Sequence, residues 1–137
     1  MSQYVVKVTQ QYKKPVSAVF ATLSNHNKLS KILGIPVKRV VDGRGDVNGV
    51  GSVRSMGLWP VTVEETVMAV TPNQSIDYRI SKGGAPLKNH SGNLTFRSTG
   101  SGSEVTWTIA FDSSLPLIGG VVKQVLQQGL KMGLKRV

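Results

Sequence analysis

LPLIGGVVKQVLQQGLKMGLKRV, residues 115–137, is the stretch that decides the fold, and it predicts a long helix. Its apolar residues recur at helical spacing with polar residues between them: Val121, Val122, Val125, Leu126, Leu130 and Leu134. Pro116 suits a first helical turn, and Ser113 or Ser114 is expected to cap it. Ordering the backbone costs about 1 to 2 kcal/mol per residue, so this helix needs a sheet on which to bury its apolar side.

Two glycines, Gly129 and Gly133, fall on the same side of this helix as its leucines. Each costs about 1 kcal/mol relative to alanine in a helix interior, which indicates that space or close approach is needed there. Two interpretations stay open at this point. The glycines allow tight packing of the helix, or they form part of a cavity wall.

The chain before the helix predicts the sheet. Residues 4–11 alternate as a strand, and two short helices follow, one opened by Pro15 with an apolar stripe to Leu23, the other over 28–33. Strands are then predicted over 37–41, 51–56, 61–70, 75–81, 90–98 and 104–112, with short turns between them. This pattern predicts an antiparallel meander in a single domain covering residues 1–137.

The net charge of +10 is unevenly distributed along the chain. Residues 1–41 hold seven basic groups and no acid, residues 113–137 hold four and no acid, and the middle is nearly balanced. A positive field on the helices favours anionic partners such as a phospholipid surface, or it serves only as a solubilising surface. The basic segments are helical and poor in exposed aromatic residues, so no nucleic-acid partner is expected.

Several chemistries are not expected from the composition. The chain has no cysteine, which excludes disulfides, thiol catalysis and cysteine-ligated zinc. The two histidines, His26 and His90, and the scattered acids give no metal-ligand spacing, and we expect neither a metal nor a cofactor. The start of the chain lacks a signal-peptide pattern and no apolar run is long enough to span a membrane, so we expect a cytoplasmic protein.

Strand parity identifies the polar residues that face the interior: Arg54, Glu65, Tyr78, His90 and Trp107. An Arg54–Glu65 pair on neighbouring strands would orient a polar ligand head, or it is a structural ion pair. His90 is a candidate acid or base with Tyr78 as its hydrogen-bond partner, or a satisfied histidine. Trp107 and Trp59 are interpreted as core and loop hydrophobes, with cavity lining as the alternative.

The order of strand, two helices, six strands and long helix is similar to the START-like or Bet v 1-like helix-grip fold. More narrowly, the chain resembles bacterial SRPBCC proteins of the polyketide cyclase/dehydrase type. The likeness spans nearly the whole chain and rests on PVSAVF at 15–20, GVGSVR at 49–54, ETV at 65–67, YRI at 78–80 and VTW at 105–107. It implies an α+β fold in which a curved antiparallel sheet of seven strands wraps around the C-terminal helix and encloses a hydrophobic cavity.

The resemblance implies binding of lipids, sterols, polyketides or hormones, and in a minority of members cyclisation or dehydration. Our first hypothesis is binding of a hydrophobic or amphipathic small molecule by these residues: Arg54, Glu65, Tyr78, His90, Trp107, Phe111 and Leu126. A second is a cyclase or dehydratase with His90 or Glu65 as acid or base, although no catalytic residue is assigned. A third is a lipid carrier whose basic helices dock on anionic membranes. The ligand, turnover and the oligomeric state stay open.

Overall fold

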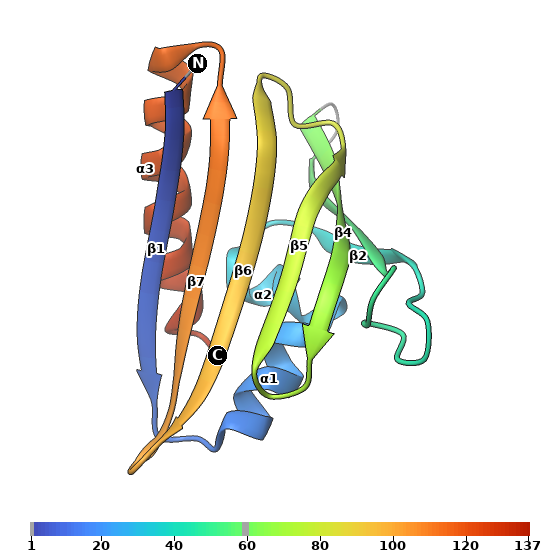
Figure 1. Cartoon of the computed structure of the whole chain (residues 1–137), viewed down its shortest axis with the longest axis vertical. Helices are drawn as coiled ribbons and strands as arrows, with labels where there is room; N and C mark the ends of the chain where they lie inside the picture. Colours follow the sequence, from blue (N-terminus) through green and yellow to red (C-terminus); the bar gives the residue numbers. More distant parts are fainter. Residues whose placement is uncertain (1, 59–60) are drawn as a thin grey trace.

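The computed structural model describes residues 2–58 and 61–137 (Figure 1). Its elements follow the predicted order: β1 (Ser2–Tyr12), α1 (Val16–Ser24), the short 3-10 helix η1 (His26–Lys28), α2 (Leu29–Leu33), β2 (Val37–Val41), β3 (Val53–Leu58), β4 (Val61–Thr71), β5 (Ser75–Lys82), β6 (Leu87–Thr99), β7 (Gly102–Ser113) and α3 (Pro116–Leu134). The seven strands form one antiparallel sheet in the order β1-β7-β6-β5-β4-β3-β2. The predicted α+β architecture is therefore confirmed.

The core lies on the face of the sheet that carries the helices. Along β7 every second side chain is buried, as strand alternation requires. Figure 1 shows α3 lying along β1 and β7, while α1 and α2 lie on the same face nearer the middle of the sheet, behind β6 and β5. No helix among the described residues is long and apolar enough to cross a membrane.

Two tyrosines of β1 hold the two ends of α3. The Tyr4 hydroxyl donates to the Pro116 carbonyl oxygen at 3.0 Å, and the Tyr12 hydroxyl donates to the Leu134 carbonyl oxygen at 2.5 Å. Pro116 opens the helix as predicted, but the predicted serine cap is wrong. Leu115 is the capping residue, and the Ser113 hydroxyl instead bonds the backbone of Leu115 outside the helix.

The apolar side of α3 is only partly buried, which corrects the expectation that all six of its periodic residues pack. Leu130 and Leu134 are buried, whereas Val121 and Val125 are 63% and 65% exposed. The physical reason is that neighbouring elements cover only part of the helix surface. The main neighbours of α3 among the described residues are β1, β7 and α2, and they leave the flank with Val121 and Val125 largely uncovered.

The two glycines of α3 have different surroundings. A Cβ on Gly133 would lie 2.9 Å from the Ile32 carbonyl oxygen of α2, so this glycine permits close packing of the two helices. A Cβ on Gly129 would meet nothing within 4 Å. Each of the two open interpretations therefore applies to one residue, tight packing to Gly133 and open space to Gly129.

The adjacent residues Gly119 and Gly120 give a matched test of this packing. A Cβ on Gly119 would lie 2.4 Å from the Tyr4 ring, which is fixed by stacking on Phe111 and by its bond to Pro116. We expect Gly119→Ala to lower the free energy of unfolding by about 1 to 3 kcal/mol. Gly120→Ala meets nothing within 4 Å and is expected to raise it by about 0.5 to 1 kcal/mol. Urea denaturation measures both, and equal effects would contradict this account of how α3 is seated.

Candidate functional site

A cavity of about 370 Å³ lies between the sheet and the flank of α3 that β1 and β7 leave uncovered. Its walls are mostly apolar and come from α3, the inner strands and the corner between α2 and β2, as in Val122, Leu126, Leu130, Met56, Ile109, Leu33 and Ile35. Gly129 also borders the cavity. Four residues predicted from strand parity supply its polar part: Glu65, Tyr78, His90 and Trp107.

The buried Arg54–Glu65 ion pair is confirmed. The two residues lie directly opposite each other on β3 and β4, and each is more than nine-tenths buried. Arg54 Nε and Nη2 both reach Glu65 Oε1, at 2.9 and 2.8 Å. The guanidinium carbon of Arg54 also lies 4.5 Å from the centre of the Tyr78 ring, a cation–π contact. Glu65 Oε2 accepts no hydrogen bond from the described residues and lies 3.9 Å from His90 Nε2.

His26 completes the surroundings of Arg54, and sequence reasoning missed it. The Ser52 hydroxyl donates to the Gly49 carbonyl oxygen at 2.6 Å, so it accepts the hydrogen of His26 Nε2 at 2.8 Å. His26 Nδ1 is then free to accept from Arg54 Nη1 at 3.3 Å. This order of donors requires a neutral ring. Burial, together with the charges of Arg54 and Arg39, lowers the pKa of His26 to about 4.

The sequence contained a signal for one of these two missed residues. Ser52 has the same strand parity as Arg54, and both belong to the GVGSVR stretch on which the resemblance rests. His26 lies in η1, where no strand or helix period applies. No pattern of spacing connects it with residues that follow it by more than 20 positions in the chain.

His90 faces inward on the same strand parity as Leu94 and Phe96, and it lies at a bulge in β6. Lys88 pairs with Asp112 and Ser91 with Ala110, so Asn89 and His90 together face one residue of β7. Asn89 takes the left-handed conformation, with φ of 53°. His90 Nδ1 accepts the backbone N–H of Ile80 at 3.1 Å, which places the remaining ring hydrogen on Nε2, facing Glu65. Burial lowers the pKa of His90, and Glu65 partly opposes this shift.

The hydrogen-bond partner of Tyr78 is Trp107, and the predicted bond to His90 is not formed. Trp107 Nε1 donates to the Tyr78 oxygen at 2.8 Å, while the Tyr78 and His90 rings lie 5.7 Å apart at a tilt of 46°. No described residue accepts the hydrogen of the Tyr78 hydroxyl. The ring occupies the space that a side chain at position 92 would need, because a Cβ on Gly92 would come within 2.0 Å of it. Burial and the nearby Glu65 raise the pKa of Tyr78.

Leu126 and Phe111 are the other two residues predicted to contact the ligand. Leu126 borders the cavity. Phe111 does not, which corrects its place among the cavity residues: it is fully buried and stacks on Tyr4 with ring centres 5.3 Å apart. Strand parity placed Phe111 correctly inward, but it lies under the first turn of α3, where the helix is seated closely on β1. Trp59 lies outside the described residues.

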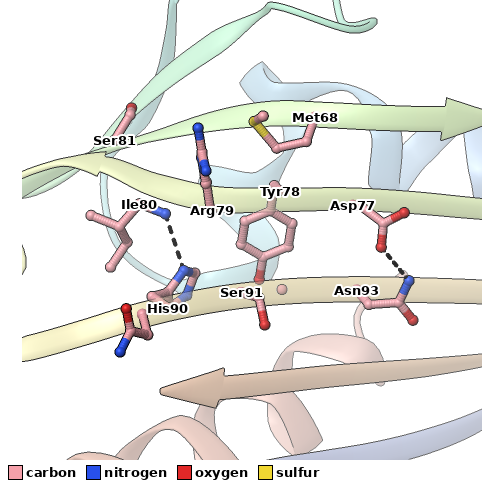
Figure 2. A pocket seen from close by; sticks show the side chains of 11 residues that line it. Met68, Asp77, Tyr78, Arg79, Ile80, Ser81, His90, Ser91 and Asn93 are labelled. Carbon is pink, nitrogen blue, oxygen red and sulfur yellow. Dashed lines mark hydrogen bonds between the residues drawn. The ribbon is translucent and has the colours of Figure 1, made fainter. Parts of the chain in front are cut away.

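A second hollow, of about 650 Å³, lies on the opposite face of the sheet (Figure 2). Pairing of β5 with β6 covers only residues 75–78 with 92–95, and beyond it the strands separate. The hollow is open and bordered by polar residues such as Asp77, Arg79 and Asn93. Figure 2 shows the Tyr78 ring and the Ile80–His90 bond across the gap between the strands. These side chains border both spaces and separate the outer hollow from the cavity.

Comparison with known proteins agrees with this architecture. The sequence profile of a family described as polyketide cyclase/dehydrase and lipid transport matches residues 3–137. No curated protein matches the sequence.

Solved structures resemble this fold at low sequence identity. A protein from Nitrosospira multiformis is 20% identical, with a TM-score of 0.71 over 97% of this chain and 93% of its own. Ara h 8.0201 is 18% identical, with a TM-score of 0.69 over 98% and 97% of the two chains. Protein CV1439 from Chromobacterium violaceum is 17% identical, with a TM-score of 0.69 over 97% and 96%. At these identities the likeness shows the fold.

The neutral state of His26 predicts a pH dependence of stability. In the unfolded chain His26 takes up a proton near its ordinary pKa of 6.5, whereas in the folded protein it does so only near pH 4. Its contribution is therefore complete above pH 6.5, and roughly 3 kcal/mol is lost as the pH falls to 4. Urea denaturation at pH 4, 5, 6 and 7 measures this slope. His90 adds a loss of the same sign, so His26→Gln isolates the contribution of His26 by flattening the curve. Equal slopes in the two proteins would contradict it.

Proposed function

This chain belongs to the polyketide cyclase/dehydrase and lipid transport family, and from that premise we propose that its cavity binds a neutral amphipathic small molecule. The family and the fold support a ligand-binding cavity. The apolar body of the ligand lies against α3 and the inner strands. Its polar end meets Glu65, Tyr78 and His90.

The observation that carries the proposal is spare hydrogen-bonding capacity at one end of an apolar cavity. Glu65 Oε2 can accept, while the His90 Nε2 hydrogen and the Tyr78 hydroxyl hydrogen can be donated, and none of the three has a partner among the described residues. A ligand that displaces water from this end of the cavity must supply partners for these groups, because each one left unpaired away from water costs about 1 to 3 kcal/mol. A single ligand hydroxyl would donate to Glu65 and accept from His90 or Tyr78.

The charges around the cavity favour a neutral polar end. Arg54 is the cation beside the cavity, and it is already paired with Glu65 through two contacts. His26 is held neutral by its hydrogen bonds, and burial disfavours the charged form of His90. A carboxylate head would approach Glu65 Oε2, and the described residues that line the cavity offer no free cation to offset the repulsion. A hydroxyl or carbonyl group has no such penalty.

His90 is better suited to donate a hydrogen bond than to act as a base. Its Nδ1 lone pair is used by the Ile80 N–H, and its Nε2 carries the hydrogen that faces Glu65. To accept a proton from a ligand, His90 would have to break the hydrogen bond from the Ile80 N–H to Nδ1 or move the hydrogen away from Nε2. The contacts therefore support binding more directly than the acid–base alternative.

The size of the cavity can be tested with two matched glycine variants. Gly129→Leu places a side chain at the cavity, whereas Gly120→Leu adds the same side chain on the same helix at a position that does not border it. We expect Gly129→Leu to weaken binding of the neutral fluorescent dye N-phenyl-1-naphthylamine by about tenfold or more, and Gly120→Leu by less than about twofold. Native mass spectrometry of the purified proteins is expected to show any co-purifying ligand in Gly120→Leu and not in Gly129→Leu. Equal dye binding by the two variants would contradict the site.

The preference for a neutral head can be tested by competition. We expect decanol to displace the dye at concentrations about tenfold lower than decanoate, because only the anion is repelled by Glu65. In Glu65→Gln the unpaired Arg54 would attract the carboxylate, so the preference is expected to narrow or reverse. A thermal unfolding scan first establishes that this variant is folded. Stronger displacement by decanoate in the unaltered protein would contradict a neutral polar end.

A further inference from the structure

The exposed side of α3 carries a contiguous group of apolar side chains, which we call the α3 strip: Leu117, Ile118, Val121, Val125 and Met132. Leu117 is 87% exposed, and Val121 and Val125 are 63% and 65% exposed. At about 100° per residue, the five positions fall on one side of the helix. Leu117 to Val125 are neighbours on this side, and Met132 lies two turns further along it. Grouped apolar exposure of this kind marks an interaction surface, unlike single exposed residues.

The α3 strip continues into the cavity. Val125 belongs to both, because it borders the cavity while remaining mostly exposed. Ile35, at the corner after α2, also borders the cavity and is 40% exposed. The cavity therefore reaches the surface between Val125 and Ile35, and the α3 strip lies beside that opening.

The helices around this opening carry positive charge without acids. α3 and the two residues after it contain Lys123, Lys131, Lys135 and Arg136, and α2 contains Lys31. Arg136 Nη1 donates to the Ile32 carbonyl oxygen at 2.9 Å, which brings the basic end of α3 against α2. Residues 1–41 and 113–137 contain no Asp or Glu to offset these groups.

We propose that the α3 strip docks on an anionic lipid bilayer, with Lys131 and Lys135 at the end of α3 and Lys31 of α2 against the headgroups. A basic amphipathic helix with an exposed apolar face has the two features that interfacial helices use, apolar insertion and attraction to anionic lipid. A second copy of this chain fits the surface poorly, because it would bring the same lysines together with no acid from either helix. A nucleic acid would satisfy the lysines but leave the α3 strip exposed to water.

Docking in this way would place the cavity opening at the membrane, so that a neutral amphipathic ligand enters from the bilayer. This consequence rests on the proposed function, whereas the docking itself does not. The two are separable by experiment, because vesicle binding reports docking and dye binding in solution reports the cavity.

The test is flotation of the full chain with vesicles of phosphatidylcholine, with and without about 30% phosphatidylglycerol, at about 0.1 M and 0.5 M salt. We expect binding only to the anionic vesicles at low salt. The variant Leu117→Gln/Val121→Gln is expected to lose about tenfold or more of that binding. Its control, Val5→Gln/Val47→Gln, changes two exposed valines on β1 and the 42–51 loop, away from α3, and is expected to bind normally.

A second pair of variants tests whether vesicle binding depends on where the lysines lie or only on the net charge of the protein. Lys131→Gln/Lys135→Gln is expected to weaken binding to the anionic vesicles several-fold, while Lys7→Gln/Lys88→Gln removes the same charge from β1 and β6 with little effect. Equal losses in these two variants would overturn the proposal in favour of a general positive field. Absence of vesicle binding would also overturn it, as would a solution dimer by analytical ultracentrifugation that Leu117→Gln/Val121→Gln converts to monomer. Dye binding retained by all four variants would show that such a failure leaves the proposed cavity function intact.

Discussion

The buried guanidinium of Arg54 is the constraint around which this interior is organised. A charge removed from water is destabilising by several kcal/mol unless it is paired and hydrogen-bonded, and three elements near Arg54 contribute partners. β4 supplies Glu65, η1 supplies the Nδ1 acceptor of His26, and β5 supplies the Tyr78 ring face. The turn before β3 then fixes His26 through Ser52. Removing any one partner would therefore disturb several elements together.

The same arrangement explains why unused hydrogen-bonding capacity points into the cavity. Both contacts from Arg54 to Glu65 fall on Oε1, which leaves Oε2 without a donor from the described residues. On the opposite side, His90 lies at the bulge in β6, where its Nδ1 accepts from the Ile80 backbone of β5 and its Nε2 faces Glu65. Glu65 and His90 each use one side-chain atom, Oε1 and Nδ1, in contacts between neighbouring strands. The second polar atom of each residue, Oε2 or Nε2, has no hydrogen bond to the described residues.

Sequence patterns predicted most of this arrangement, and where they failed the reason is physical. Strand alternation placed Arg54, Glu65 and His90 on the inner face because the period of a strand depends only on local backbone geometry. Alternation does not say whether an inward residue lies beside the cavity or beyond its end. It therefore predicted Phe111 as a cavity residue, whereas Phe111 packs against Tyr4 beneath α3, outside the cavity. It also could not find His26, whose role depends on a contact between η1 and β3. Helical spacing predicted α3 but not which side the sheet would cover, since that depends on where the tyrosines of β1 hold it.

Charge acts differently at the surface of this protein and in its cavity. The excess of basic groups lies in the terminal segments, including α2 and α3, where the interaction with an anionic surface is long-ranged and weakened by salt. Inside, Arg54 is neutralised by a partner less than 3 Å away and shielded from solvent, so its field is largely cancelled within the cavity. In the proposed function, selection of a ligand therefore depends on shape and on short-range hydrogen bonds, which salt affects little. A protein with a net charge of +10 can for this reason favour an uncharged ligand.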